Sequence, residues 1–228
     1  MGNLFGVFSP YVGWSSWGLN WSAVFMTMGI LPSSYWVSGY PLMATIKSLF
    51  SGLSREFSSL LSGFQQPGSL LIPCSMMIFI VFSNLMGLLP YVFTSTAHLS
   101  FTLSLALPLW MGQILLSAYK QPLWVLGHFV PEGAPMVLGP FMVLIEITSN
   151  VIRPLTLAVR LFANLTAGHI LVVLLSSTCG GLMTFAGLGV LVLLFVLELA
   201  VCVIQGYVFS TLNILYFSES ETKVVVSC

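Results

Sequence analysis

Charged residues are what this sequence has least of. Of its 228 residues only 5% are charged, and none lies between Met1 and Ile46 or between Phe57 and Tyr119. Segments of this length hold enough apolar residues to cross a hydrocarbon core about 30 Å thick, so they predict an integral membrane protein. The formal net charge of +0 also argues against a nucleic-acid partner.

Several other signals are absent. The cysteines have no metal-ligand spacing, so we interpret them as packing residues and predict neither a metal nor a cofactor. They are Cys74, Cys179, Cys202 and Cys228. No glycine-rich loop precedes Lys-Ser or Lys-Thr, so the chain lacks that nucleotide motif. The N-terminus lacks signal-peptide and transit-peptide features, so its first apolar segment is either an uncleaved helix or belongs to a chain made close to its membrane.

Long apolar runs are what the sequence has in abundance, with 57% apolar residues and a mean hydropathy of +1.03. Such runs suit spanning helices, whose backbone groups bond within the segment, rather than the alternating strands of a barrel. We therefore predict an all-α, polytopic fold with residues 1–228 in a single membrane domain. One N-terminal transmembrane helix is expected within residues 12–37, which carry tryptophans near both ends.

Residues 42–61 show a different pattern. Their apolar residues recur at helical spacing, while Lys47, Arg55 and several serines fill the opposite side. This pattern predicts an amphipathic helix that lies on the membrane surface, with an ordinary solvated loop helix as the alternative. The two cations also suggest that this surface faces the matrix or cytoplasm.

Residues 70–118 predict a helical hairpin, because two uncharged apolar segments are joined by a short polar break at residues 94–98. Asn84 is the one strongly polar residue deep in the first segment. A hydrogen bond between helices and a role in ion transfer are both open for it. His98 is expected to be solvated at the tip of the hairpin.

Two further apolar runs are too long for upright spans. Residues 136–177 would extend about 63 Å as one helix, roughly twice the hydrocarbon thickness. Pro140 and Pro154 can break or kink this run, but steep tilting is the other way to fit it into the membrane. With the run at residues 182–217, residues 136–217 are expected to form a hairpin of two long, strongly tilted helices.

Each long run carries polar residues on one face. Positions 146, 150, 153, 157, 160, 164 and 168 share one side of a helix, so Arg153 and Arg160 point the same way. An arginine at the bilayer centre costs about 2.5–3.5 kcal/mol on insertion scales and about 10–17 kcal/mol in simulations. Glu198 and Gln205 likewise share a face of the second run, and we interpret both stripes as candidate functional sites.

Six sequence blocks then stand in an order known from one family. They are FSNLMGLLPY (82–91), LALPLWMG (105–112), HFVPEGAP (128–135), PFMVLIE (140–146), IRPLTLAVRLFANLTAGHI (152–170) and LELAVCVIQGYVF (197–209). On these blocks the chain resembles subunit a of the F-type ATP synthase in its short mitochondrial form. His169 supports that form, because bacterial relatives typically have glutamate there. The first 60 residues match only in general character.

The resemblance implies a non-catalytic, proton-conducting stator subunit in the mitochondrial inner membrane. It implies as partners a ring of proteolipid subunits, other subunits of the membrane sector including the peripheral stalk, the lipid bilayer and protons. Arg160 aligns with the family's essential arginine. That residue pairs with each passing ring carboxylate and separates two aqueous half-channels.

The same resemblance implies roles for six further residues. His169 and Glu198 match the half-channel that takes protons from the intermembrane space, and Glu146 matches a carboxylate of the release side. The polar residues that line the interface or support Arg160 are Arg153, Asn164 and Gln205. For each of these positions the alternative is a structural hydrogen bond between helices.

Two other functions stay open at this point. A secondary transporter also has broken apolar helices with charges inside the membrane, but it usually shows an internal repeat, and this sequence shows none. A purely structural membrane scaffold leaves the two aligned arginines unexplained.

Overall fold

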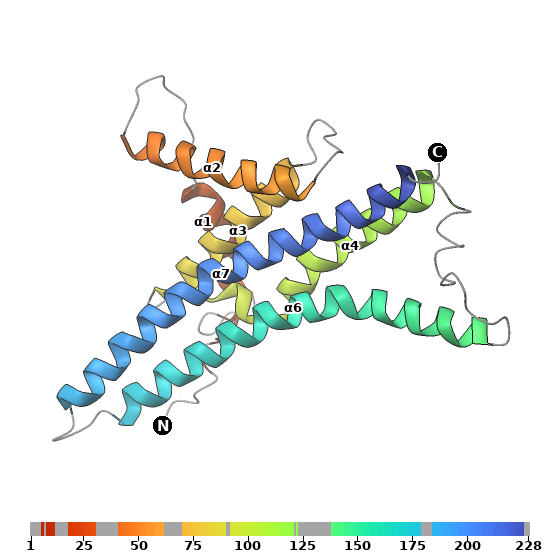
Figure 1. Cartoon of the computed structure of the whole chain (residues 1–228). Helices are drawn as coiled ribbons and strands as arrows, with labels where there is room; N and C mark the ends of the chain where they lie inside the picture. The colour runs from red at the N-terminus through yellow and green to blue at the C-terminus, as the bar shows by residue number, and fades with distance from the viewer. Residues whose placement is uncertain are drawn as a thin grey trace.

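The structure is a computed structural model that describes residues 6, 8–11, 18–30, 41–61, 70–89, 92–120, 122, 138–178 and 184–225. Its elements are η2 (Leu19–Trp21), α1 (Ser22–Ile30), α2 (Pro41–Leu60), α3 (Leu71–Leu88), η3 (Ser95–Ala97), α4 (Leu99–Lys120), α6 (Gly139–Thr178) and α7 (Thr184–Val225) (Figure 1). No strand occurs among these residues, so the predicted all-α fold is confirmed.

Four of these helices are long and apolar enough to cross a membrane: α3, α4, α6 and α7. They make the protein polytopic, as predicted. Of the expected first span, α1 covers residues 22–30, while residues 12–17 and 31–40 lie outside the described part of the chain. The first transmembrane helix therefore stays a prediction.

Each of the two long apolar runs is one continuous helix. With 40 and 42 residues, α6 and α7 extend about 60 Å and 63 Å. The second helix was expected to end at Phe217, where the apolar run stops, but it continues to Val225. The reason is that helical hydrogen bonds belong to the backbone, and the glutamates and lysine of this last stretch are good helix formers.

The sequence explains how α6 keeps its polar side chains within an apolar helix. Its serine and threonine hydroxyls donate to carbonyls one turn back, as in the 3.0 Å bond from Thr148 to Leu144 and the 2.9 Å bond from Thr156 to Arg153. Pro154 lies inside the helix and has no N–H to donate to the carbonyl of Asn150. Figure 1 shows that α6 bends between its two halves.

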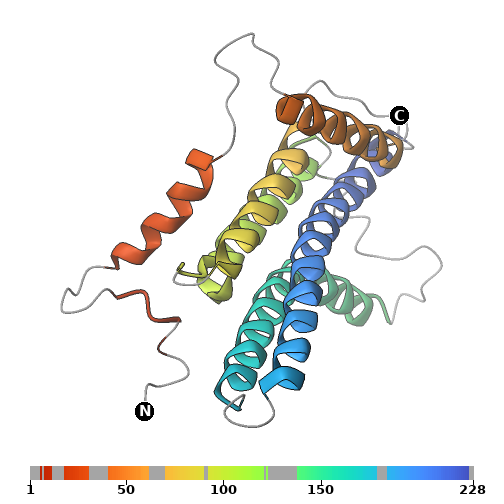
Figure 2. The ribbon, with the colours of Figure 1, turned by 90° about the vertical axis from the view of Figure 1, so that its left-hand side faces the viewer.

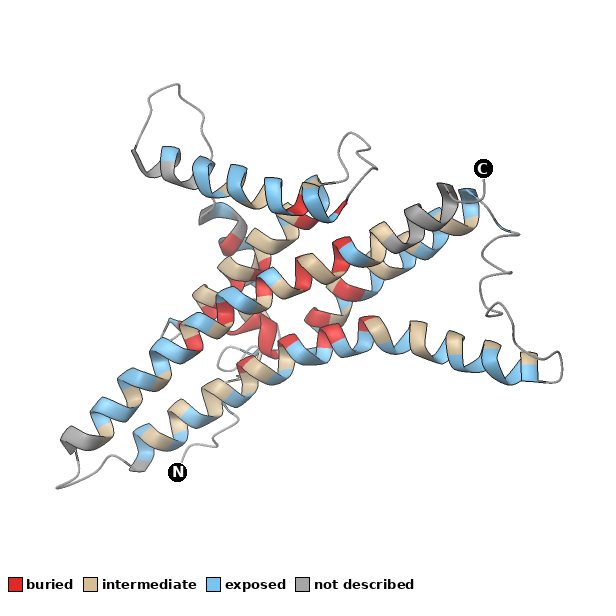
Figure 3. Cartoon of the chain, viewed as in Figure 1, coloured by how far each residue is buried: buried red, intermediate tan, exposed pale blue. Residues whose placement is uncertain are grey.

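The core lies where the long helices cross. Its main cluster joins α3, α4, α6 and α7 through Ile80, Ala106, Leu157, Ala158, Leu161 and Phe209. Buried residues gather at this crossing, whereas the arms of α6 and α7 that extend beyond it are largely exposed (Figure 3). Exposed apolar side chains on such arms suit contact with lipid or with partner helices.

Helices α3 and α7 approach closely at Gly206. A Cβ atom placed there would overlap the side chain of Val81 on α3, so only glycine allows this contact. The two helices of the predicted 70–118 hairpin, α3 and α4, run apart (Figure 1). Helix α3 packs mainly on α7, and α4 packs mainly on α6.

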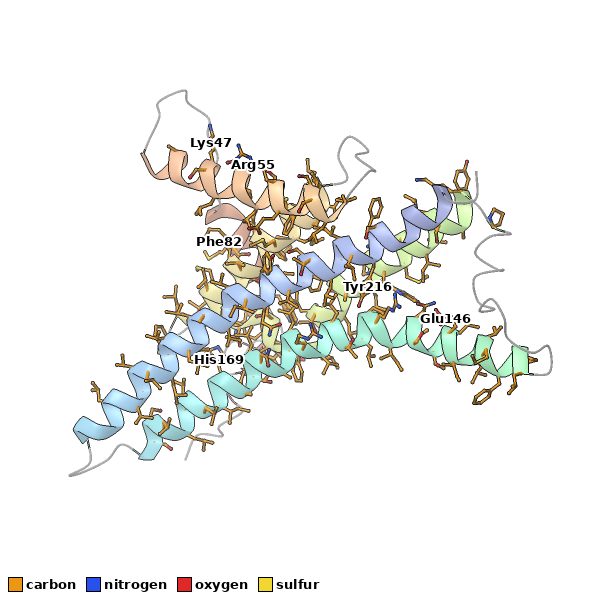
Figure 4. The ribbon with its side chains drawn as sticks, viewed as in Figure 1. Lys47, Arg55, Phe82, Glu146, His169 and Tyr216 are labelled. Atoms are coloured by element: carbon orange, nitrogen blue, oxygen red, sulfur yellow. The ribbon has the colours of Figure 1, made fainter. Side chains whose placement is uncertain are left out.

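Helix α2 lies near the start of α3 and packs on α7 (Figures 1 and 2). Phe57 and Leu61 bury its apolar side against Ile214 of α7, and the Phe57 ring stacks on Tyr207 at 6.2 Å between centroids. Lys47 and Arg55 are exposed and point away from the bundle (Figure 4). This one-sided burial matches the amphipathic pattern, and its position on the membrane surface stays a prediction.

We predict that α6 and α7 lie steeply tilted in the membrane, because each is about twice as long as the hydrocarbon core is thick. Spin labels placed along α6 should change depth slowly, by well under about 1.5 Å per residue. The measurement is the ratio of oxygen to nickel-chelate collisions in reconstituted complexes. Labels on α3, whose 18 residues match the core, provide the control with a steep gradient. Two full depth cycles along α6 would show two upright spans and contradict the prediction.

Candidate functional site

His169 and Glu198 face each other across the α6–α7 hairpin. The distance between Nε2 of His169 and Oε1 of Glu198 is 3.9 Å, and the side chains are 15% and 7% exposed. Neither of these two atoms has a hydrogen-bond partner within the described part of the chain. The structure thus brings together two buried groups that can each hold or release a proton.

Gly168 makes room for this pair. A Cβ atom at this position would lie 2.6 Å from Oε1 and 2.9 Å from Cδ of Glu198, well inside contact distance. The glutamate carboxyl therefore packs directly against the backbone of α6, beside the imidazole of the next residue.

Arg160 lies on the exposed side of α6. Its helix neighbours Leu157 and Leu161 are buried in the core, while Arg160 is exposed. Among the described residues it makes no hydrogen bond or ion pair. Its fixed positive charge is therefore presented outward, toward whatever covers this face of the helix.

Arg153 has different surroundings, although the spacing places both arginines on one face. Its guanidinium carbon lies 5.1 Å from the ring centroid of Tyr216 on α7, a distance typical of a cation–π contact. The buried Pro154 lies between the two arginines in sequence, and α6 bends between its two halves (Figure 1). Regular spacing alone does not show this difference.

The other predicted site residues are partly exposed. Glu146 lies in the opposite half of α6 from His169 (Figure 4). Asn164 follows Arg160 by one turn, and Gln205 follows Glu198 by two turns on α7. Within the described residues none of these three side chains makes a hydrogen bond or ion pair, so the structure does not join them to the His169–Glu198 pair.

Residues 94–97, in the polar break between α3 and α4, are buried, which corrects the expectation of a solvated His98 at the tip of the hairpin. The Oγ1 atoms of Thr94 and Thr96 have no hydrogen-bond partner among the described residues. His98 is half-buried, with its ring centroid 5.1 Å from that of Phe93 and 5.4 Å from that of Trp21. Aromatic packing around the imidazole is the physical reason, and the count of polar residues in the break did not reveal it.

Two amides tie other helices to α7. Asn84 donates from Nδ2 to the carbonyl of Cys202 at 3.5 Å, which is the bond between helices considered for it. Sequence reasoning missed Gln113 of α4, whose Nε2 donates to Oδ1 of Asn213 at 2.6 Å and to its carbonyl at 3.1 Å. The available signal was a lone amide within an uncharged apolar helix, where an unpaired polar group is costly.

Comparison with known proteins assigns this architecture to a family. Residues 17–218 match the ATP synthase A chain family. The chain belongs to that family. It is 44% identical to ATP synthase subunit a of Locusta migratoria and 46% identical to that of Drosophila melanogaster, each over 96% of this chain and 99% of the relative. ATP synthase subunit a of Aedes aegypti is 44% identical over the same shares.

Membership of the ATP synthase A chain family decides against the secondary transporter and the structural scaffold. It makes the chain a stator subunit of the proton-translocating membrane sector, and it is of the mitochondrial form. With four helices able to cross a bilayer, it is a multi-pass protein of the mitochondrial inner membrane. It acts within that complex as one subunit among others.

The space at Gly168 yields a test of the site. We predict that Gly168→Ala slows proton flow through the reconstituted complex, because the new Cβ displaces the Glu198 carboxyl from His169. Glu198→Asp in the same variant shortens the acid and should restore part of the rate. Gly189→Ala on α7 is the control, since a Cβ there meets nothing within 4 Å. Equal rates in Gly168→Ala and Gly189→Ala would contradict the prediction.

Proposed function

We propose that this subunit provides two aqueous half-channels and that Arg160 couples proton flow to rotation of a proteolipid ring. The observation that carries the proposal is the order of polar groups along α6. Arg160 is exposed and lies about 14 Å along the helix from His169 and about 21 Å from Glu146 on the other side. Arg160 thus stands between two separate acid–base sites.

The role of Arg160 follows from the chemistry of its guanidinium. This group stays protonated in proteins, so it cannot itself carry the proton through. Its positive charge favours the ionised form of a carboxyl group that comes close. A protonated ring carboxyl approaching from one side loses its proton, passes as the carboxylate, and takes up a new proton on the other side. The same positive charge opposes direct passage of protons from one half-channel to the other.

Unpartnered polar atoms support the position of the uptake half-channel. In the described residues six buried side-chain atoms lack a hydrogen-bond partner: Asn84 Oδ1, Thr94 Oγ1, Thr96 Oγ1, His98 Nε2, His169 Nε2 and Glu198 Oε1. Each unsatisfied group costs about 1–3 kcal/mol, and buried polar groups of this kind are commonly satisfied by water. They lie on α3, on the α3–α4 connection and on the α6–α7 pair. A hydrated path along them would lead to Glu198.

Glu146 is the proposed acid of the release side. It is partly exposed on the half of α6 before the bend, while His169 is on the half after it (Figure 4). Arg153, held over Tyr216, lies between Glu146 and Arg160 and contributes positive charge to this part of the path. Each proton that moves down the full membrane potential releases about 2.3 kcal/mol of free energy per 100 mV.

We assign to Asn164 and Gln205 the role of polar neighbours at the surface that meets the ring. Both are partly exposed, and Asn164 is one helical turn from Arg160. The peripheral stalk and other membrane-sector subunits are the proposed occupants of the remaining exposed helix faces.

Substitution of the buried pair tests the uptake half-channel. We predict that His169→Ala and Glu198→Gln each slow proton-driven ATP synthesis in reconstituted vesicles without disassembly of the complex. The double substitution should lower the rate of ATP synthesis by a smaller factor than the product of the two single reductions, because the two groups act in one step. Ser176→Ala, an exposed position further along α6, is the control. Unchanged synthesis in the double variant would refute the pairing.

Arg160 and Arg153 provide a matched comparison of one residue type. We predict that Arg160→Ala abolishes coupled proton transport, since the ring carboxyls lose the cation that ionises them. Arg160→Lys keeps a charge but loses the planar fork and titrates more readily when desolvated, so it should also be severely impaired. Arg153→Lys should retain much more activity, because an ammonium group still places a cation over Tyr216.

The measurement is proton-driven ATP synthesis in vesicles, with assembly of each complex assessed separately. A near-parental rate in assembled Arg160→Ala complexes would show that the coupling charge is another residue. Equal losses in Arg160→Lys and Arg153→Lys would remove the distinction between the two arginines.

A further inference from the structure

The N-terminal segment reaches the buried pair from a third direction. The ring of Phe8 meets the imidazole of His169 edge-on, with centroids 6.3 Å apart and planes at 87°. Phe8 itself is half-buried. His169 thus has α7 and Glu198 on one side and an aromatic ring from the start of the chain on another. No sequence pattern indicated this contact, because the two residues are 161 positions apart in the chain.

Hydrogen bonds fix the segment that carries Phe8. Ser9 donates from both its backbone N–H and its hydroxyl to the carbonyl of Gly6, at 3.2 Å and 2.9 Å, and so closes a turn around Phe8. Asn20 of η2 donates from Nδ2 to the carbonyl of Ser9 at 3.3 Å. The turn is therefore tied to η2.

Trp21 in turn anchors η2 to the bundle. Its ring lies 5.6 Å from that of Phe93, 5.4 Å from that of His98 and 6.5 Å from that of Phe101, measured between centroids. These residues belong to the α3–α4 connection and the first turn of α4. The turn at Phe8 is thereby held between the α3–α4 connection and the α6–α7 hairpin.

We infer that Phe8 is a positioning residue that covers the imidazole of His169 and holds it facing Glu198. A phenyl ring offers no hydrogen-bond partner to either imidazole nitrogen, and its edge contact limits rotation of the imidazole plane. Nε2 then stays directed at Oε1 of Glu198, and the imidazole is shielded from lipid and bulk water on the side of the N-terminal segment. The inference rests on the proposed function only for its effect on proton flow.

The reactivity of His169 tests the inference directly. Intact complexes in vesicles are treated with diethyl pyrocarbonate, and modification of each histidine is followed by mass spectrometry. In Phe8→Ala, His169 should react several-fold faster, while His98, which has its own aromatic neighbours, serves as the internal standard. Phe8→Tyr keeps the ring and should match the parent. Tyr11→Ala is the control, because Tyr11 lies in the same segment but is 60% exposed.

The outcomes separate this inference from the proposed function. Faster modification in Phe8→Ala together with slower proton flow supports both. Faster modification with unchanged proton flow supports the inference and counts against His169 as a proton carrier. Equal reactivity of His169 in Phe8→Ala, Tyr11→Ala and the parent overturns the inference. If Phe8→Ala does not assemble, the same comparison in Phe8→Leu, which keeps the apolar bulk but lacks the ring edge, decides between these outcomes.

Discussion

The mismatch between helix length and bilayer thickness is the constraint on which the rest of this structure depends. Helices α6 and α7 have 40 and 42 residues, about twice the length that an upright span requires. Helices this long cannot form a compact bundle with the 18 and 22 residues of α3 and α4. They cross them instead, so the core is confined to the crossing and the arms keep their apolar side chains exposed.

The crossing also decides which polar groups are paired within the chain. Near it, Asn84 and Gln113 donate to α7 from two other helices, and His169 faces Glu198 where Gly168 removes the steric barrier. On the outer side of α6, Arg160 is exposed even though its neighbours Leu157 and Leu161 are buried at the crossing, and Glu146 is partly exposed in the half of α6 before the bend. Buried amides thus hold the helices in register, whereas Arg160 and Glu146 remain accessible to protons or to partner subunits.

The sequence predicted the helices well and the tertiary contacts unevenly. Long apolar runs and proline positions were enough for α3, α4, α6 and α7, because such runs leave a membrane chain little choice but helix. The family resemblance assigned His169 and Glu198 to one half-channel, and the two side chains lie 3.9 Å apart. The burial of residues 94–97 and the Phe8 contact did not follow. They depend on side-chain packing between distant segments, which helical spacing does not record.

The outer face of α6 around Arg160 shows how the proposed function and the fold fit together. One turn before Arg160 stands Thr156, and one and two turns after it stand Ala163 and Ala167, all exposed. Small side chains at this spacing let another helix approach closely in a membrane. An arginine facing lipid alone would cost several kcal/mol, so its exposure here is stable only against a surface that brings a countercharge. In the proposed function, that charge would come from a closely packed helix with one carboxyl group at the depth of Arg160. A rotating ring can supply it repeatedly, because each subunit that leaves is replaced by the next.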